Sequence, residues 1–257
     1  EHVDNDFPGY AAPMPKHGAR WIEIMRKERG QAPMIDVGYM PVMCNHCDNA
    51  PCLEEAQNGA VTKRDDGIII IDPVKSKGQK QLVDSCPYDR IWWNEELQIP
   101  QIWTFDAHLL DEGWKEPRAV SVCATGAIIA KKVSDAEMAK ITKEENLEVL
   151  EPKKGTKPRV YYKNLYRYNK CFIGGSVAVK KDGVEDCLKD AKVQLNHGSE
   201  TVSEASTDVF GDFKFDKLDE NSGKYEITIS ADGYSSTSID VELKESITVD
   251  DIYLTKA

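Results

Sequence analysis

Four cysteines in one stretch of the chain have the spacing of metal ligands. Cys44, Cys47 and Cys52 lie within nine residues, and Cys86 follows with a proline directly after it. Thiolates are soft donors that bind zinc and iron–sulfur clusters, and four of them complete the ligand set of either group. The spacing therefore predicts a metal centre made of these four cysteines.

The grouping of three close cysteines with a distant Cys-Pro favours a 4Fe–4S cluster. In two-cluster ferredoxins, three cysteines of one motif share their cluster with the Cys of a Cys-Pro that belongs to the other motif. The chain has one complete set of this kind. Two alternatives stay open, namely a zinc ion, although zinc ribbons usually show two C-x2-C pairs, and four unligated thiols.

The other cysteines and the histidine near the predicted centre have different expected roles. His46 lies between Cys44 and Cys47, and we expect it to form hydrogen bonds beside the centre rather than to bind the metal. The chain has seven cysteines, and clustering of four of them does not suit a disulfide scaffold. The clustered thiols indicate a reducing, cytoplasmic location. We therefore expect Cys171 and Cys187 to be free buried thiols, and the alternative is a disulfide.

The composition indicates a folded acidic protein without a recognisable site for substrate chemistry. The 257 residues carry a net charge of −11, which argues against a nucleic-acid partner. No apolar run approaches the roughly 20 residues that a membrane helix needs, so we expect no insertion into a membrane. The chain has no nucleophile elbow, no phosphate loop and no convincing histidine–carboxylate set, so we assign no catalytic residue to it.

The elements expected to position the cysteines are short. Turn residues between β-rich runs predict two hairpins, one over 60–72 and one over 91–103. The segment 21–25 alternates in polarity and predicts a strand. Ser134-Asp135-Ala136-Glu137 is a capping box and predicts a helix that ends near Lys143.

The chain changes character from about Cys171 onward. Short alternating apolar runs separated by turn residues predict a small antiparallel sandwich or barrel, of immunoglobulin-like or carboxypeptidase-regulatory-like type. This part has nine lysines, no arginine and eighteen acidic residues, a net charge of −9 that leaves −2 for the rest. The predicted fold class is α+β, with a ferredoxin-like iron–sulfur domain over 1–168 and a β domain over 169–257.

Longer segments around the cysteines resemble a known family. Residues 44–52 (Cys-Asn-His-Cys-Asp-Asn-Ala-Pro-Cys), 67–73 (Gly-Ile-Ile-Ile-Ile-Asp-Pro) and 86–89 (Cys-Pro-Tyr-Asp) are similar to the iron–sulfur subunits that partner molybdopterin enzymes of the dimethyl-sulfoxide-reductase superfamily. Similar segments at 26–30, 107–111 and 155–167 extend the resemblance over nearly the whole chain. They are most similar to the small subunits of transhydroxylases that act on hydroxylated aromatics.

The resemblance implies an electron-transfer subunit in anaerobic metabolism. The catalytic site, with a molybdenum or tungsten pterin, would lie in a large partner subunit of a heterodimer or higher assembly. A structural subunit is the alternative, because transhydroxylation involves no net redox change. In that interpretation the cluster only stabilises the fold and the β domain docks the catalytic subunit. A zinc-bound interaction module is a third interpretation.

The resemblance also implies that some cluster positions have been lost. The family has four cysteine motifs that work in pairs, and the last Cys of each motif serves the cluster of its partner motif. One missing cluster would have had its ligands at Ala56, Ser76, Gln79 and Leu82, and another would have had three at Trp103, Asp106 and Ala119. Cys123 would be the fourth ligand of a further cluster whose other three ligands precede residue 1. We expect such an upstream segment, and the alternative is that Cys123 is a relic.

Overall fold

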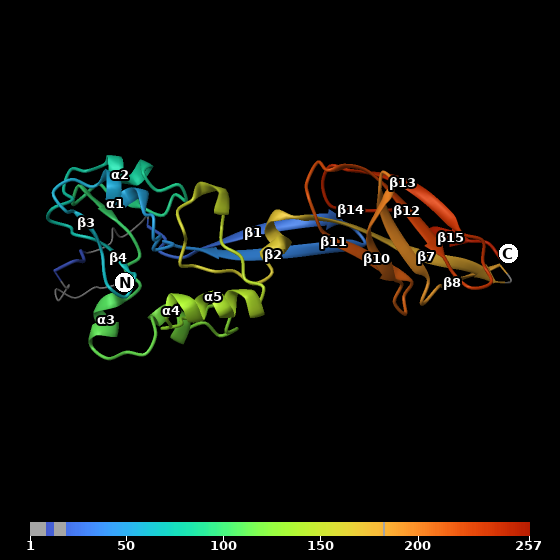
Figure 1. The fold of residues 1–257 in the computed structure, drawn as a ribbon, viewed down its shortest axis with the longest axis horizontal. Coiled ribbons are helices and arrows are strands. Elements are labelled where there is room, and N and C mark those ends of the chain that lie inside the picture. The colour runs from blue at the N-terminus through green and yellow to red at the C-terminus, as the bar shows by residue number, and fades with distance from the viewer. Residues whose placement is uncertain (1–8, 13–18, 182) are drawn as a thin grey trace. The chain divides into compact units, whose positions relative to one another are not determined.

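The computed structural model describes residues 9–12, 19–181 and 183–257, which form two compact units (Figure 1). The first unit contains the described residues up to Met25 together with Pro41–Asn164, and the second contains Arg26–Met40 and Leu165–Ala257. The expected division into 1–168 and 169–257 stays a prediction about independent folding. The boundaries of the two compact units differ from this division, because residues 26–40 belong to the second unit.

The elements of the first unit are short, and loops connect them. Its two small hairpins, β3–β4 and β5–β6, are antiparallel and confirm the predicted pairs. The elements are α1 (Pro51–Glu55), β3 (Val61–Lys63), β4 (Ile69–Ile71), α2 (Gln81–Asp84), β5 (Trp92–Asn94), β6 (Ile99–Gln101), α3 (Ala107–Asp111), α4 (Arg118–Ser121), α5 (Asp135–Glu144) and the 3-10 helix η1 (Pro152–Lys154).

The capping box forms the helix that the sequence predicts. The Ser134 hydroxyl accepts a hydrogen bond from the Glu137 N–H at 3.2 Å, which satisfies one of the free amides at the start of α5. The helix ends at Glu144, one residue beyond the expected end. Among the described residues, no helix is long and apolar enough to cross a membrane.

The second unit is a two-sheet sandwich. Its strands are β7 (Cys171–Lys181), β8 (Val184–Cys187), β9 (Lys192–His197), β10 (Glu200–Ser206), β11 (Asp212–Leu218), β12 (Gly223–Ser230), β13 (Thr237–Leu243), β14 (Ile247–Thr248) and β15 (Ile252–Leu254), and the short helix α6 (Tyr166–Asn169) precedes them. One sheet has the order β10-β9-β12-β13, and β7 is the centre of the other, between β11 and β14. Inward-facing apolar residues of both sheets, such as Ile173, Leu195, Phe215 and Ile227, form one core.

The predicted sandwich is confirmed, but the barrel alternative and the wholly antiparallel pairing are wrong. The sheets do not close into a barrel, because β10 and β13 remain the outer strands of their sheet. The pairing is also not wholly antiparallel. After β13 the chain crosses to the other sheet and runs beside β7 in the same direction, so β14 and β15 pair with β7 in parallel.

The long strands β1 (Glu23–Gln31) and β2 (Met34–Val42) form a hairpin whose residues 26–40 belong to the second unit. Arg29 anchors it there. Its guanidinium is 3% exposed and donates to Asp36 at 2.9 Å and to Asp216 of β11 at 2.7 Å. It also lies over the Phe172 ring at 5.3 Å. The predicted strand over 21–25 is the beginning of this hairpin.

Candidate metal centre

The segment that follows β2 presents three of the predicted cysteines. Cys44 and Cys47 lie in an irregular loop, and His46 between them has a left-handed backbone with φ of 45°. Cys52 is the second residue of α1, which begins at Pro51. Proline is favourable there because the first helical residue needs no N–H donor. The loop and the start of the helix therefore bring three thiols to one side of the first unit's core.

The fourth cysteine comes from a separate segment, just after α2. The Ser85 hydroxyl donates to the Leu82 carbonyl at 2.7 Å, and the Asp89 N–H donates to the Cys86 carbonyl at 3.1 Å, so the chain turns sharply around Cys86. The Arg90 N–H points at the Cys86 sulfur at 3.4 Å. A backbone N–H directed at a sulfur stabilises a thiolate, as in iron–sulfur proteins.

The structure brings all four predicted ligands to one apolar cluster. Cys47 is 8% exposed, and Cys44, Cys52 and Cys86 pack against the same buried group, which includes Ile69, Ile71 and Leu82. Burial raises the pKa of Cys44, and it raises the pKa of Cys52 to about 12. The neighbouring cysteines raise both values further. Four deprotonated thiols at this place therefore need a cationic group between them.

The four thiols are donors of a kind that both zinc and iron–sulfur clusters accept. Zinc binds sulfur at about 2.3 Å, so its thiolates must lie within roughly 4 Å of one another. Among the described residues, no three His, Cys, Asp or Glu side chains are placed to share one metal ion. The cysteines nevertheless lie close enough together that Cys47 and Cys86 raise the pKa of both Cys44 and Cys52.

His46 is positioned to hold the loop rather than to bind metal through Nδ1. This atom accepts a hydrogen bond from the Ile69 N–H at 3.0 Å, which ties the cysteine loop to β4. Burial, and then the charge of Lys63, lower the pKa of His46 to about 3, so the ring is neutral at physiological pH. Its ring and the Phe105 ring form a T-shaped pair with the centroids 5.8 Å apart.

A second group of residues supports the cysteine loop and was missed by the sequence analysis. The Lys63 ammonium donates to the carbonyls of His46 and Cys47, at 3.0 and 2.7 Å. The Thr156 carbonyl accepts from the Asn49 N–H at 3.0 Å, and the Thr156 hydroxyl lowers the pKa of Cys47 against the larger effect of burial. No local pattern in the segment 155–167 indicated that it packs beside the cysteines.

At the positions that the resemblance implies for one lost cluster, polar and apolar side chains pack together. Ser76 and Leu82 are completely buried. The Gln79 amide accepts from the Gln57 N–H at 2.9 Å and donates to the Lys75 carbonyl at 2.8 Å. It therefore joins two backbone segments at a place where the resemblance implies a former ligand.

The positions implied for the other lost cluster are filled in a similar way. Trp103 is 3% exposed and packs against Phe105 with the ring centroids 5.1 Å apart. The Asp106 carboxylate is buried and accepts a hydrogen bond from the Arg118 N–H at 2.9 Å. Ala119 lies in α4.

The remaining cysteines have separate surroundings. Cys123 is partly exposed, and hydrogen bonds from the Ile128 N–H and the Thr125 hydroxyl lower its pKa. Cys171 and Cys187 are free thiols, as expected, and Cys171 is buried in the sandwich core. The expectation of burial is wrong for Cys187, because β8 lies at the margin of the sandwich and all four of its residues are exposed.

Comparison with known proteins agrees with this two-part organisation. Residues 35–133 match the 4Fe-4S dicluster domain family, and residues 173–255 match the carboxypeptidase regulatory-like domain family. The chain is 48% identical to the pyrogallol hydroxytransferase small subunit of Pelobacter acidigallici over 244 residues, which are 93% of this chain and 86% of the relative.

More distant relatives share the first part of the chain. One of the subunits of the tetrathionate reductase of Salmonella typhimurium is 35% identical, over 49% of this chain and 52% of its own length. The beta subunit of the dimethylsulfide dehydrogenase of Rhodovulum sulfidophilum is 31% identical, over 58% of this chain and 46% of its own. The chain belongs to the family of iron–sulfur subunits of molybdoenzyme complexes that includes the pyrogallol hydroxytransferase small subunit.

Proposed function

We propose that Cys44, Cys47, Cys52 and Cys86 hold a 4Fe–4S cluster through which this chain transfers electrons for a large molybdopterin-binding subunit. The observation that carries the proposal is the meeting of four thiols, from two separate segments, on one buried cluster of side chains. When bound, the cluster supplies one-electron oxidation and reduction. The free thiols suit a reducing compartment, and we propose the cytoplasm as its location.

The residues around the thiols have the means to adjust such a cluster's potential. The Arg90 N–H directed at Cys86 and the Lys63 ammonium beside the Cys47 carbonyl place positive charge near the sulfurs. Positive charge and N–H donors stabilise the reduced, more negative form, whereas burial disfavours it. Residues of this chain would therefore set the balance between these effects on the cluster's potential.

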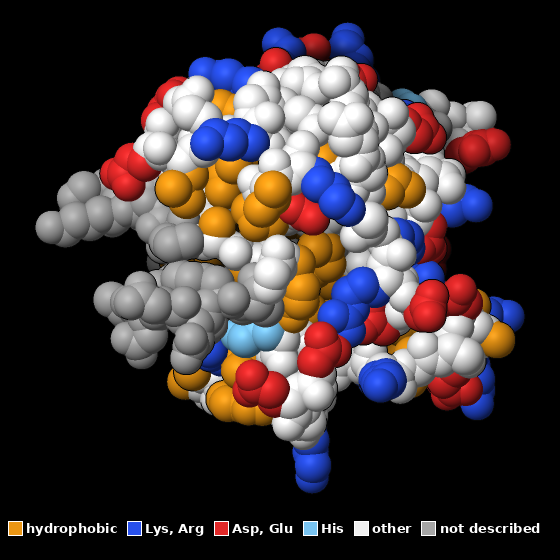
Figure 2. Space-filling model, turned by 90° about the vertical axis from the view of Figure 1, so that its left-hand side faces the viewer, with side chains coloured by type: hydrophobic (Ala, Val, Ile, Leu, Met, Phe, Trp, Pro, Cys, Tyr) orange, Lys and Arg blue, Asp and Glu red, His pale blue; other side chains and the backbone are white. Residues whose placement is uncertain are grey.

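The partner and substrate follow from the nature of the relatives. We propose a catalytic subunit with a molybdenum or tungsten pterin that acts on a hydroxylated aromatic, because the relative with 48% identity is named for pyrogallol. The first unit exposes several large apolar side chains, among them Val74, Val122 and Ile129. Figure 2 shows hydrophobic side chains between charged ones on one face of this unit, which suits contact with another protein.

Cys123 is the candidate ligand of a second cluster. Its sulfur lies among hydrogen-bond donors, namely the backbone N–H of Ile128 and the Thr125 hydroxyl, and such donors stabilise a ligating thiolate. The structure does not place it with the other four cysteines. We propose that its companion ligands come from residues before Glu1.

A purely structural role for the cluster is the second candidate. It is favoured by the filled positions around Gln79 and Trp103, because they leave fewer sites for a relay of clusters within the described residues. In this case the cluster would stabilise the first unit, and the β domain would dock the catalytic subunit.

A charge variant separates the two roles in the intact complex. Lys63→Gln keeps a hydrogen-bond donor but removes a positive charge, so the cluster's midpoint potential should fall. If the chain transfers electrons, rapid mixing with pyrogallol should show a changed rate of cluster oxidation or reduction, and turnover should change with it. The matched control is the exposed Lys140→Gln on α5. A lowered potential with unchanged turnover and iron content would reject electron transfer and support the structural role.

A further inference from the structure

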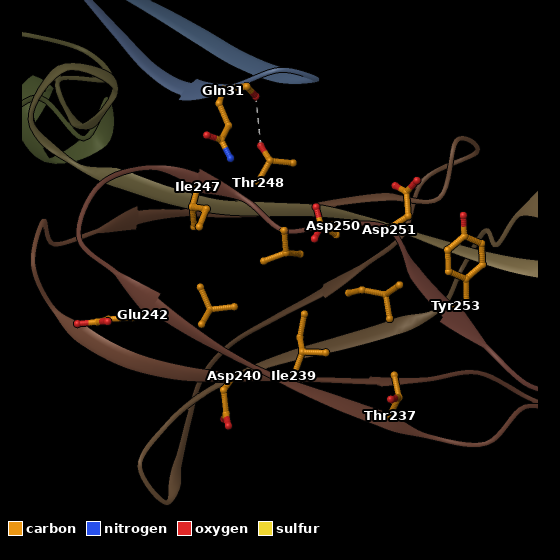
Figure 3. Close-up of a pocket in the computed structure, with 13 residues that line it drawn as sticks. Gln31, Thr237, Ile239, Asp240, Glu242, Ile247, Thr248, Asp250, Asp251 and Tyr253 are labelled. Carbon is orange, nitrogen blue, oxygen red and sulfur yellow. Dashed lines mark hydrogen bonds between the residues drawn. The ribbon is translucent and has the colours of Figure 1, made fainter.

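The sandwich of the second unit is open on one side, where a groove of about 690 Å³ lies between its two sheets (Figure 3). β13 borders the groove from one sheet, and β14 and β15 border it from the other. Among the described strands, β13 pairs only with β12, and β14 and β15 pair only with β7. Both sides of the groove are therefore free sheet edges.

The inner surface of the groove is aliphatic. Ile239 and Val241 of β13 line it together with Ile247 and Val249 from the other sheet, and Figure 3 shows Ile239 and Ile247 on its two sides. Val241 is buried, whereas Ile239, Ile247 and Val249 are only partly buried and pack on the margin of the sandwich core. Apolar surface left exposed at this margin would gain free energy if another chain covered it.

The rim of the groove is acidic. Asp240, Glu242, Asp250 and Asp251 line it, and no lysine or arginine does. The Glu242 carboxylate forms an ion pair with the Lys244 ammonium at 3.7 Å. Within the part of the chain that the structure describes, the other three carboxylates form no ion pair. Unpaired carboxylates beside an apolar groove attract a cationic partner.

Aliphatic and acidic side chains alternate along β13, on opposite faces of the sheet. Ile239 and Val241 point to the core side of the sheet, and Asp240 and Glu242 point to its outer side. Figure 3 shows the Ile239 and Asp240 side chains directed oppositely. A strand added to this edge would match both sides if its aliphatic residues alternated with basic ones.

The same edge is unsuited to a second copy of this chain. Edge strands are commonly protected by lysine, proline or a bulge. β13 contains neither proline nor lysine, and its register with β12 is continuous from Thr237 to Leu243. Two copies paired through β13 would bring like charges of Asp240 and Glu242 together, which disfavours that pairing.

We infer that β13 is a docking edge for an extended segment of another protein, in which aliphatic residues alternate with lysine or arginine. The segment adds to the sheet as a fifth strand beside β13. Its backbone pairs with the free edge, its aliphatic side chains enter the groove, and its cationic side chains meet Asp240 and Glu242 on the outer side of the sheet. Asp250 and Asp251 provide further negative charge across the groove.

Three synthetic peptides test the mode of binding on the full chain. The first has seven residues, the length of β13, with valine alternating with lysine. The second has glutamate in place of lysine, and the third is the first with N-methylated alternate amides, which cannot pair along one edge. Fluorescence anisotropy should show binding of the first peptide alone, with an affinity that falls as salt increases. Absence of binding, or equal binding of the glutamate or N-methylated peptide, would overturn the proposal.

A pair of charge-matched variants locates the site. Asp240→Asn with Glu242→Gln should weaken binding of the valine–lysine peptide about fivefold, the effect of two exposed ion pairs. Glu200→Gln with Glu220→Gln removes the same charge away from the groove and should leave the affinity within about twofold. Equal weakening in both variants would show that only net charge matters. Self-association that the groove variant abolishes would assign the edge to a second copy instead.

Discussion

The two units of this chain obtain their order from different sources. In the described part of the first, no element wholly within the unit is longer than the ten-residue α5, and the strands β3 to β6 have three residues each. Its buried side chains gather around the cysteines. In the second, long strands bury alternate aliphatic residues in one continuous core. From this comparison we expect the first unit to depend on a bound group, whereas the second is stabilised by apolar burial.

Two buried cysteines illustrate the difference. Cys171 is enclosed by the aliphatic core of the sandwich and serves as a small apolar residue. Cys47 is also buried, but Cys44, Cys52 and Cys86 pack against the same buried cluster of side chains. Burial of one neutral thiol among hydrocarbons is stabilising, whereas four thiols that bind metal must lose their protons, so their burial as thiolates requires the charge of the metal centre.

Removal of iron should have the largest effect, and it should be confined to one unit. Without the cluster, the loop of Cys44 and Cys47 and the turn of Cys86 lose the group that joins them, so the first unit should lose its amide protection. The second unit should retain it. Hydrogen exchange of the full chain before and after iron chelation, read separately over β3–β4 and β9–β12, measures this. Equal loss in both units would contradict the comparison.

A cavity made by mutation in the sandwich core should destabilise the second unit and leave the iron content unchanged. Ile227 is completely buried in β12, and Ile227→Ala should lower the free energy of unfolding of the second unit by about 3 kcal/mol. The iron content should not change. Lys224→Ala, at an exposed position of the same strand, should stay within about 0.5 kcal/mol. Urea unfolding and iron analysis of both variants give the comparison, and loss of iron in Ile227→Ala would show that the units depend on each other.

The ion pairs of Arg29 should have a smaller, pH-dependent effect. Arg29→Met should destabilise the second unit by about 2 kcal/mol, less than for a fully isolated buried pair. The reduction is expected because Arg167 and Lys214 still contact Asp36 and Asp216. The control is Arg26→Met, which removes an exposed guanidinium from the same strand.

The direction of the pH effect follows from the two carboxylates. Hydrogen bonds from Arg167 and Arg29 lower the pKa of Asp36, and those from Arg29 lower the pKa of Asp216 although burial opposes them. Their stabilisation is therefore present above the unfolded pKa of about 4 and is lost as the pH falls below it. The difference between wild type and Arg29→Met in urea unfolding should shrink from pH 7 to pH 3. A constant difference would exclude these pairs as its source.

Much of the fold could be predicted because its signals are local. The Ser134 cap, the turns of both hairpins and the alternation in β9, β11, β12 and β13 each occupy a few adjacent residues. β7 gave no such signal. Its first five residues are all buried because both faces of the strand are covered there: Gly30 and Met34 of the β1–β2 hairpin lie close to Phe172 and Gly174. The strand therefore shows no alternation over these residues.

Long-range contacts explain most of what the sequence did not indicate. The pairing of Arg29 with Asp216 joins residues far apart in the chain, and nothing near either residue indicates the other. The same holds for Lys63 and Thr156 beside the cysteine loop. The four cysteines were an exception, because a metal centre demands a particular residue type at a particular spacing.

The most direct test of this account compares two cysteine variants of the full chain. Cys86→Ser removes one proposed ligand, and Cys187→Ser removes an exposed thiol of β8 as a matched control. Iron, acid-labile sulfide and the electron paramagnetic resonance spectrum of the reduced protein are measured for each. We expect Cys86→Ser to lose one 4Fe–4S cluster, about four irons per chain, and Cys187→Ser to match the wild type. Unchanged iron, sulfide and spectrum in Cys86→Ser would contradict the assignment of the four ligands.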